Sequence, residues 1–155
     1  PITINQGLRM PGWYDIISLD SDQHDTKGLK KSMEIVEDII LNRLKTANEK
    51  IKICLIGFSQ GAALSLFFAA QSLIKIHGVI SLSGYIPIKK QEEIDYKIPI
   101  LALHGLHDDI INIDYAKKSF HNHLKKEDFE LRTFNMGHEV ILEQVDYIKK
   151  FLTSI

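Results

Sequence analysis

Three residues in this sequence have side chains that could together carry out acyl transfer. Ser59 stands at the centre of a Gly-x-Ser-x-Gly pattern, Asp108 belongs to a polar cluster, and His138 follows later in the chain. A serine hydroxyl is a weak nucleophile unless a base takes its proton, and an imidazole oriented by a carboxylate suits that step. These residue types predict attack of Ser59 on an acyl carbonyl, with His138 as base and Asp108 orienting the imidazole.

The glycines around this serine lie where an apolar stretch meets a helical one. Residues 51–58 are apolar at almost every position, which is typical of a strand buried on both faces of a parallel sheet. Residues 62–70 are small and apolar, as in a packed helix. A strand, a tight turn around a serine and a helix form a nucleophile elbow. We expect side chains at Gly57 and Gly61 to strike neighbouring backbone, and the serine to be strained and to point outward.

The rest of the chain alternates strands with helices. We expect further strands at 76–82, 98–103 and 129–134. We expect further helices at 26–46, 114–124 and 141–152. This alternation predicts an α/β fold with a mainly parallel sheet and right-handed crossovers. The carboxyl ends of parallel strands share one edge, so Ser59, Asp108 and His138 should meet there.

Other polar residues compete for roles at that edge. Asp109 stands beside Asp108 and is a second candidate acid, whereas Asp114 is better explained as a helix cap. His104 closes a strand, where a histidine bonded to backbone is the commoner case, and His107 either faces solvent or contacts the site. His104, His107 and Asp108 have the side-chain types of a metal site, but no HExxH or CxxC pattern accompanies them, so we expect no metal.

Composition limits the classes of function. A chain of 155 residues fits one domain, and a formal net charge of −1 argues against nucleic acid or an anionic membrane as the main partner. The single cysteine, Cys54, is expected to be buried in its strand and builds no disulfide framework, so a reducing cytoplasm is the default. No apolar run approaches about 18 residues, so we expect no transmembrane segment.

Several segments resemble the carboxylesterase/phospholipase family, which includes acyl-protein thioesterases. The matching segments are GFSQGA at 57–62, LSGYIP at 82–87, HGxxDxII at 104–111, MGHE at 136–139 and MPGWYDI at 10–16. The resemblance covers nearly all of the chain. It implies an α/β-hydrolase fold with helices on both faces of the sheet, and hydrolysis of carboxylic esters or thioesters, including acylated proteins and lysophospholipids, without a cofactor.

The same resemblance assigns roles to individual residues. It implies that Ser59, Asp108 and His138 form the catalytic triad, and it favours Asp108 over its neighbour. It also implies that Gln60 supplies one backbone N–H of the oxyanion hole. Trp13 and Met136 are the candidate substrate-binding residues, although Trp13 is equally well explained as a structural aromatic.

The sequence departs from the family at its start. Family members carry additional strands and a His-Gly-rich loop with a second oxyanion N–H, and this sequence begins after both. We therefore expect an N-terminally truncated fold, with residues 1–155 forming two-thirds to three-quarters of the usual domain. Losing one oxyanion donor typically costs roughly 10²–10³ in rate. The chain is then a fragment, a truncated gene product or a chain completed by a partner.

Strand 51–58 would also have an apolar unpaired edge, which hints at a homo-oligomer. Two other functions stay open. The missing loop motivates a non-catalytic remnant that binds acyl ligands or a partner. A phosphate-binding module using the turn at 57–61 is the third candidate, and it leaves His138 unexplained. For a hydrolase with a histidine base, activity should rise with pH as the imidazole loses its proton.

Overall fold

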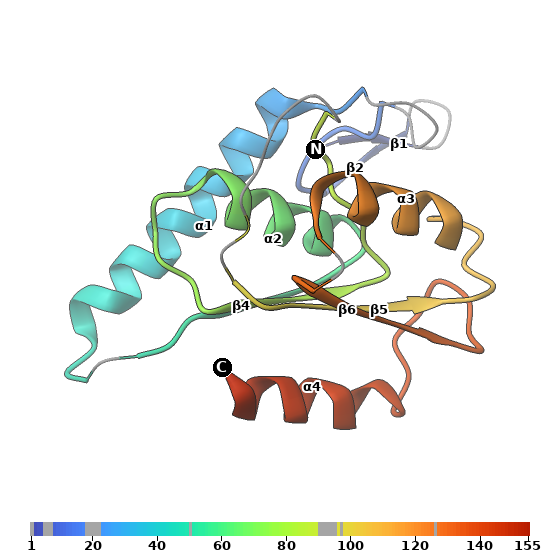
Figure 1. Cartoon of the computed structure of the whole chain (residues 1–155). Helices are drawn as coiled ribbons and strands as arrows, with labels where there is room; N and C mark the ends of the chain where they lie inside the picture. The colour runs from blue at the N-terminus through green and yellow to red at the C-terminus, as the bar shows by residue number, and fades with distance from the viewer. Residues whose placement is uncertain are drawn as a thin grey trace.

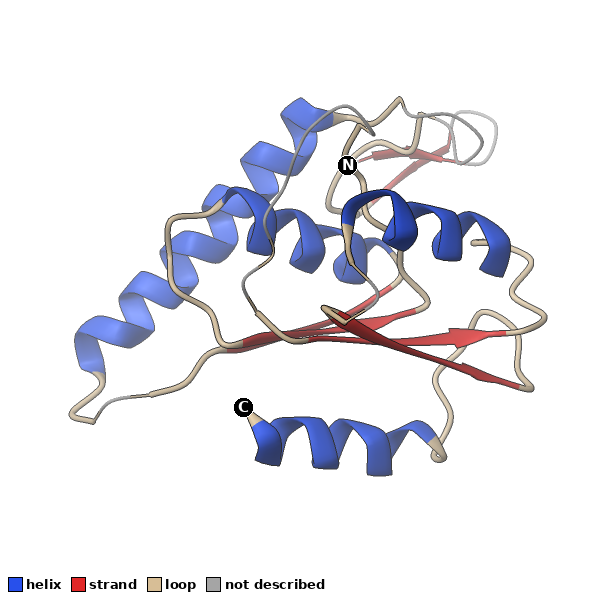
Figure 2. Cartoon of the chain, in the orientation of Figure 1, coloured by secondary structure: helices blue, strands red, loops and turns tan. Residues whose placement is uncertain are grey.

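Within the residues that the structure describes, the main sheet has four parallel strands. The structure is a computed structural model, and it describes residues 2–4, 8–17, 23–49, 51–89, 96, 98–125 and 127–155. The strands run in the order β3 (Cys54–Phe58), β4 (Gly78–Leu82), β5 (Ile100–Gly105) and β6 (Phe129–Phe134). A separate antiparallel pair, β1 (Ile2–Ile4) and β2 (Leu8–Met10), lies near the N-terminus (Figure 2). The predicted α/β fold with a parallel sheet is therefore confirmed.

Helices cover both faces of the main sheet. They are α1 (Thr26–Thr46), α2 (Gln60–Gln71), α3 (Ile113–His123) and α4 (Gln144–Ser154). Helices α1, α2 and α3 lie on one face, and α4 is the one described helix on the other (Figure 1). Among the helices of the described residues, none has the length and apolar character needed to cross a membrane.

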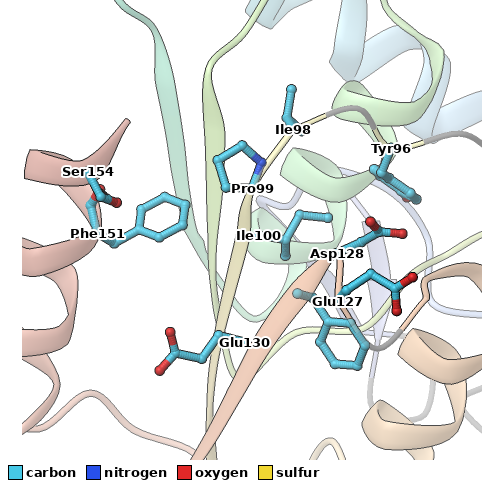
Figure 3. A pocket seen from close by; sticks show the side chains of 10 residues that line it. Tyr96, Ile98, Pro99, Ile100, Glu127, Asp128, Glu130, Phe151 and Ser154 are labelled. Atoms are coloured by element: carbon cyan, nitrogen blue, oxygen red, sulfur yellow. Dashed lines mark hydrogen bonds between the residues drawn. The ribbon is translucent and has the colours of Figure 1, made fainter.

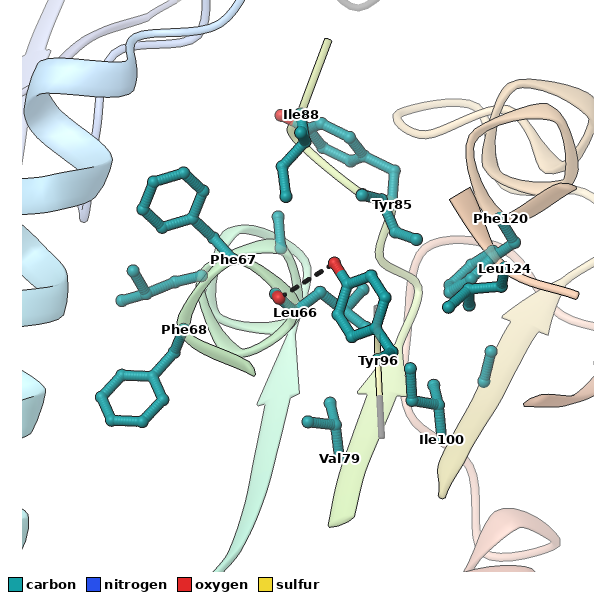
Figure 4. Close-up of a cluster of buried hydrophobic side chains, with 14 of the residues drawn as sticks. Leu66, Phe67, Phe68, Val79, Tyr85, Ile88, Tyr96, Ile100, Phe120 and Leu124 are labelled. Carbon is teal, nitrogen blue, oxygen red and sulfur yellow. Dashed lines mark hydrogen bonds between the residues drawn. The ribbon is translucent and has the colours of Figure 1, made fainter. Parts of the chain in front are cut away.

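The larger core lies between the sheet and the three-helix face. Helix α2 is buried along most of its length, which agrees with its small and apolar composition. Phe68 of α2, Val79 of β4 and Phe120 of α3 are inaccessible to solvent and pack in this core (Figure 4). The Tyr96 hydroxyl donates a hydrogen bond of 3.1 Å to the backbone carbonyl of Leu66, so the one polar atom of this buried ring is satisfied.

The smaller core lies under the sheet against α4. Ile148 and Phe151 of this helix pack on the underside, and Gly78 leaves room for the Phe151 ring, since a Cβ there would lie 2.9 Å from it. The spacing of the apolar residues predicts one buried face on this helix, made by Ile141, Val145, Ile148 and Leu152. The prediction is wrong at Leu152, which is 47% exposed. Phe151 lies on the buried face of the helix instead, because its aromatic ring fits against Gly78.

Strand β3 is an edge strand, not a central one. Within the described part of the chain it pairs only with β4. Ile56 is 54% exposed and Phe58 39% exposed, and Cys54 is only half-buried. The prediction of a strand buried on both faces is therefore wrong. An apolar run does not by itself distinguish an edge strand from a central one. The unpaired edge agrees with the expectation drawn from the family resemblance.

The helix caps explain where two helices begin. The sequence offers Asp25 and Thr26 as candidate caps of this helix, and the Asp25 carboxylate accepts from the backbone N–H of Gly28, so Asp25 caps α1. The Asn112 side chain accepts from the backbone N–H of Asp114 at 2.8 Å. Asp114 thus lies in the first turn of α3 rather than capping it, and the expected cap is corrected to Asn112.

Candidate active site

Ser59 lies in a strained turn between β3 and α2. Its φ of 54° is in the left-handed region, which costs free energy for a residue other than glycine. Its backbone N–H donates to the carbonyl of Leu82 at the end of β4, at 2.9 Å, which anchors the turn to the carboxyl edge of the sheet. Its hydroxyl makes no hydrogen bond that caps α2, so it remains available for other partners.

The two glycines around Ser59 differ in what they allow. A Cβ on Gly57 would lie 2.2 Å from the carbonyl atoms of Gly61, so the crowding expected at this position exists. A Cβ on Gly61 would meet no atom closer than the indole nitrogen of Trp13, at 3.8 Å. The expectation that both glycines are required by crowding is therefore wrong for Gly61.

The loops after β5 and β6 are fastened to each other. The backbone N–H of Leu106 donates to the carbonyl of Phe134 at 2.8 Å, and that of His107 donates to Met136 at 3.0 Å. A Cβ on Gly105 would lie 2.3 Å from the carbonyl oxygen of Gly137, so only glycine permits this approach. The two loops carry Asp108 and His138, and their backbone contacts hold those side chains within reach of each other.

Ser59, His138 and Asp108 form a continuous line of hydrogen bonds. His138 Nε2 lies 2.9 Å from the Ser59 hydroxyl, and His138 Nδ1 lies 2.8 Å from Asp108 Oδ2. An ionised carboxylate can only accept, so Nδ1 carries the proton. Nε2 of the neutral ring is then the acceptor for the serine O–H. The structure brings together the three residues that the sequence expected at this edge.

Asp108 is buried and fully hydrogen-bonded. Its Oδ1 accepts from the backbone N–H groups of Ile110 at 3.1 Å and Ile111 at 2.8 Å. Burial alone raises the pKa of this carboxyl, but the hydrogen bonds from His138 and Ile111 outweigh it, so the pKa lies below its ordinary value. Asp109, the rival acid, is exposed.

Two contacts at the site were not expected from the sequence, one made by Phe58 and one by His104. The Phe58 ring packs on the His138 imidazole with a centroid separation of 4.8 Å. His104 bonds to backbone as expected, with Nε2 2.8 Å from the Ile111 carbonyl, but Nε2 also lies 3.4 Å from Asp108 Oδ2. The sequence holds one signal for each of these contacts. Phe58 directly precedes the elbow turn, and His104 precedes Asp108 by four residues.

Gln60 uses its side chain to hold the segment before α1. Its Oε1 accepts from the backbone N–H of Trp13, and its Nε2 donates to the carbonyl of Tyr14, both at 3.2 Å. The Trp13 side chain is 43% exposed and lines a groove of about 360 Å³ together with Phe58 and Gly61. The expected substrate contact of Trp13 is compatible with this position beside the elbow.

Met136 and His107 make contacts with residues other than Ser59. Met136 is 5% exposed and packs in the smaller core, so its position favours packing over the expected contact with substrate. His107 Nε2 lies 2.9 Å from the Asn135 side-chain oxygen. Among the described residues, no three His, Cys, Asp or Glu side chains gather as metal ligands.

A second hollow lies at the opposite edge of the sheet. It has a volume of about 500 Å³ and is lined by residues that include Pro99, Glu130 and Phe151 (Figure 3). Pro99 directly precedes β5, and Glu130 stands near the start of β6. Because the strands are parallel, this hollow is separated from Ser59 by the length of the sheet and is not part of the candidate active site.

The fold is that of an α/β-hydrolase, with a serine at the turn between strand and helix. Residues 1–155 match the family model described as phospholipase/carboxylesterase, and the chain belongs to that family. It is therefore a serine hydrolase that acts on ester-type bonds (EC 3.1).

Individual relatives agree with this family. The Dictyostelium discoideum protein named acyl-protein thioesterase 1 homolog 1 is 36% identical over 164 residues, covering 99% of this chain and 71% of that protein. Acyl-protein thioesterase 1 of Candida albicans is 33% identical over 169 residues, covering 100% of this chain and 73% of that protein. The crystal structure of Arabidopsis thaliana SOBER1 shares the fold, with a TM-score of 0.83 at 22% identity, covering 99% of this chain and 78% of that one.

Proposed function

We propose that this chain hydrolyses carboxylic esters or thioesters through a covalent acyl-enzyme on Ser59. The observation that carries the proposal is the line of hydrogen bonds from the Ser59 hydroxyl to His138 at 2.9 Å and from His138 to Asp108 at 2.8 Å. Family membership supports the class of reaction, and this geometry supports the assignment of the three roles.

In the acylation half, Ser59 Oγ attacks the acyl carbonyl carbon while its proton passes to His138 Nε2. A tetrahedral intermediate forms, and its carbonyl oxygen carries the negative charge. The buried Asp108 carboxylate stabilises the positive charge that develops on the imidazole. His138 then gives the proton to the departing alkoxide or thiolate, which leaves as an alcohol or thiol, and the acyl group remains esterified to Ser59.

Deacylation repeats these steps with water as the nucleophile. His138 Nε2 takes a proton from water as its oxygen attacks the acyl carbonyl carbon of the ester. When this second tetrahedral intermediate collapses, the proton returns to Ser59 Oγ and the carboxylic acid departs. The reaction consumes one water, and no redox step or external cofactor is needed to balance it.

Gln60 is the proposed donor to the oxyanion, through its backbone. It is the first residue of α2, and the first N–H groups of a helix have no acceptor within the helix. These groups also lie at the positive end of the helix dipole, which favours an anionic oxygen beside Ser59. The side chain of Gln60 is engaged with Trp13 and Tyr14, so this role belongs to the backbone alone.

The proposed substrates carry a long acyl chain, as acylated proteins or lysophospholipids do. Apolar side chains are exposed on the loops that hold the site, with Leu106 47% exposed, Ile110 54% and Val140 50%. Such exposed apolar residues suit contact with an acyl chain. The names of the relatives as acyl-protein thioesterases support a thioester on a protein as the first substrate to test.

The test compares hydrolysis of an S-acylated peptide, a p-nitrophenyl ester and a lysophospholipid by the wild type and by Ser59→Ala. We expect turnover by the wild type and a loss of about 10³-fold or more in Ser59→Ala. Ser154→Ala, an exposed serine at the end of α4, is the matched control and should keep full activity. Equal turnover by the wild type and Ser59→Ala would overturn the proposal.

A further inference from the structure

We infer that His104 is a positioning residue that holds the Asp108 carboxylate in place through its Nε2–H. The inference rests on the proposed function, in which Asp108 orients His138. His104 does not touch the serine hydroxyl in this arrangement. It acts instead through Asp108, as the last member of a chain of four side chains that begins at Ser59.

Nitrogen atoms surround both oxygens of the Asp108 carboxylate. Asp108 Oδ1 accepts from the backbone N–H groups of Ile110 and Ile111. Oδ2 faces two imidazoles, with His138 Nδ1 at 2.8 Å and His104 Nε2 at 3.4 Å. A carboxylate offers about four acceptor positions, and a buried one is costly to leave partly unfilled. His104 Nε2 is thus the fourth nitrogen around this carboxylate, and its contact with Oδ2 is longer than the hydrogen bonds of the other three.

His104 also anchors the loop that carries Asp108. His104 is the penultimate residue of β5, and its Nε2 donates to the Ile111 carbonyl at 2.8 Å. The backbone N–H of the same Ile111 donates to Asp108. A side chain on the rigid strand therefore fixes the far end of the loop, and the loop end in turn fixes the carboxylate.

The burial of the His104 ring determines its charge state. The ring is 1% exposed, and the charged or titratable groups that act on it are Asp108, His138 and Lys117. Burial lowers the pKa of His104 and outweighs the hydrogen bond to Ile111. A carbonyl can only accept, so the single proton of the neutral ring lies on Nε2. Its N–H therefore donates to the Ile111 carbonyl, with the Asp108 carboxylate oxygen 3.4 Å from the same nitrogen.

Removing the donor should change catalysis in a particular way. Without this N–H beside it, Oδ2 holds its negative charge less well, and the pair formed by Asp108 and His138 takes up a proton more readily. The acid limb of the kcat/KM profile should therefore move to higher pH. The substrate contacts are unchanged, so kcat should fall while KM stays constant.

The experiment uses His104→Leu, which lacks a donor, and His104→Gln, whose amide nitrogen reaches the position of Nε2. We expect His104→Leu to lose about 10- to 100-fold in kcat, since the buried Ile111 carbonyl loses its hydrogen bond and the Asp108 carboxylate loses the N–H beside it. His104→Gln should recover most of that loss and the wild-type acid limb. His121→Leu, an exposed histidine on α3, is the matched control and should leave both quantities unchanged.

A second variant and a spectroscopic measurement test the role of His104 if His104→Leu does not fold or if turnover cannot be followed. His104→Asn keeps a polar amide that is too short to reach Ile111 or Asp108, so it serves as the variant without the donor if His104→Leu does not fold. The downfield proton resonance of His138 Nδ1–H reports the same contact without turnover, and it should shift in His104→Leu and return in His104→Gln. If His104→Leu or His104→Asn folds and keeps the wild-type kcat, the acid limb of the pH profile and the His138 resonance, the inference is overturned. If folded wild type lacks all turnover, the proposed function fails, and the resonance alone decides the role of His104.

Discussion

The backbone N–H of Trp13 donates to the side-chain oxygen of Gln60 at 3.2 Å, which fastens the segment before α1 to the residue that follows Ser59. The same side chain donates to the Tyr14 carbonyl. Gln60 therefore has two separate tasks, one for its side chain in stability and one proposed for its backbone in catalysis. Substitution of the side chain can separate them.

Gln60→Ala removes two hydrogen bonds and keeps the backbone N–H. We expect the free energy of unfolding to fall by about 1–2 kcal/mol, because each bond contributes roughly 0.5–1.5 kcal/mol. The value of kcat/KM should change by no more than about threefold. Urea unfolding and ester hydrolysis measure the two effects, with Gln71→Ala at the exposed end of α2 as control. A loss of activity without a loss of stability would assign the side chain itself to catalysis.

The two glycines of the Gly-x-Ser-x-Gly pattern should respond differently to alanine. Gly57→Ala places a Cβ 2.2 Å from the Gly61 backbone, and we expect it to lower the free energy of unfolding by about 2–3 kcal/mol or to prevent folding. Gly61→Ala has space and lies within α2, so stability should be unchanged or higher by about 0.5 kcal/mol. Thermal unfolding of both variants decides, and equal losses would contradict this account of the turn.

Asp108→Asn should separate the two neighbouring acids. The amide keeps the shape of the carboxylate but has no charge to stabilise the imidazolium, and its NH2 group can face Nδ1 and favour the wrong tautomer, so kcat should fall about 10⁴-fold. Asp109→Asn, at the exposed neighbour, should retain activity within about threefold. Steady-state hydrolysis by the two variants is the measurement. If Asp109→Asn is the inactive one, the assignment of the orienting acid is wrong.

The burial of His104 should make the fold sensitive to acid. Its pKa is lowered in the folded protein, so between that value and about 6.5, the ordinary value in an unfolded chain, the unfolded state binds more protons. The free energy of unfolding should therefore decrease as pH falls below about 6.5. Urea unfolding from pH 8 to 5 should show a shallower decrease for His104→Gln than for wild type, and parallel curves would refute this origin of the acid sensitivity.

The open edge of β3 should promote self-association. An apolar strand edge without charges pairs readily with another chain, and Ile56 at its centre is 54% exposed. We expect the wild type to form dimers or larger species as concentration rises in sedimentation velocity, and Ile56→Lys to shift it to monomer. Leu73→Lys, an exposed leucine after α2, adds the same charge elsewhere and should not. A wild type that stays monomeric throughout would contradict the prediction.

Much of this arrangement could be predicted from the sequence because it follows from local patterns. Alternating apolar and helical segments place Ser59, Asp108 and His138 after three different strands, and parallel strands bring those ends to one edge. The boundaries of β6 and α1 follow from the same patterns. These features depend on residues close together in the chain.

The features that could not be predicted depend on contacts between distant segments. The apolar run in β3 does not reveal whether a strand lies on each side, so its exposure had to come from the structure. Phe151 replaced Leu152 on the buried face of α4 because Gly78, on another element, leaves room for a ring. The contact of His104 with Asp108 likewise depends on how the loop to Ile111 closes.

The most direct test of the central claim is the site of covalent labelling by a fluorophosphonate, located by peptide mass spectrometry. Such a reagent bonds to a serine only where a base and oxyanion donors are assembled around it. We expect a single adduct on Ser59 in the wild type, strong slowing in His138→Gln, and none in Ser59→Ala. A folded wild type without an adduct, or with the adduct on another serine, would contradict the account.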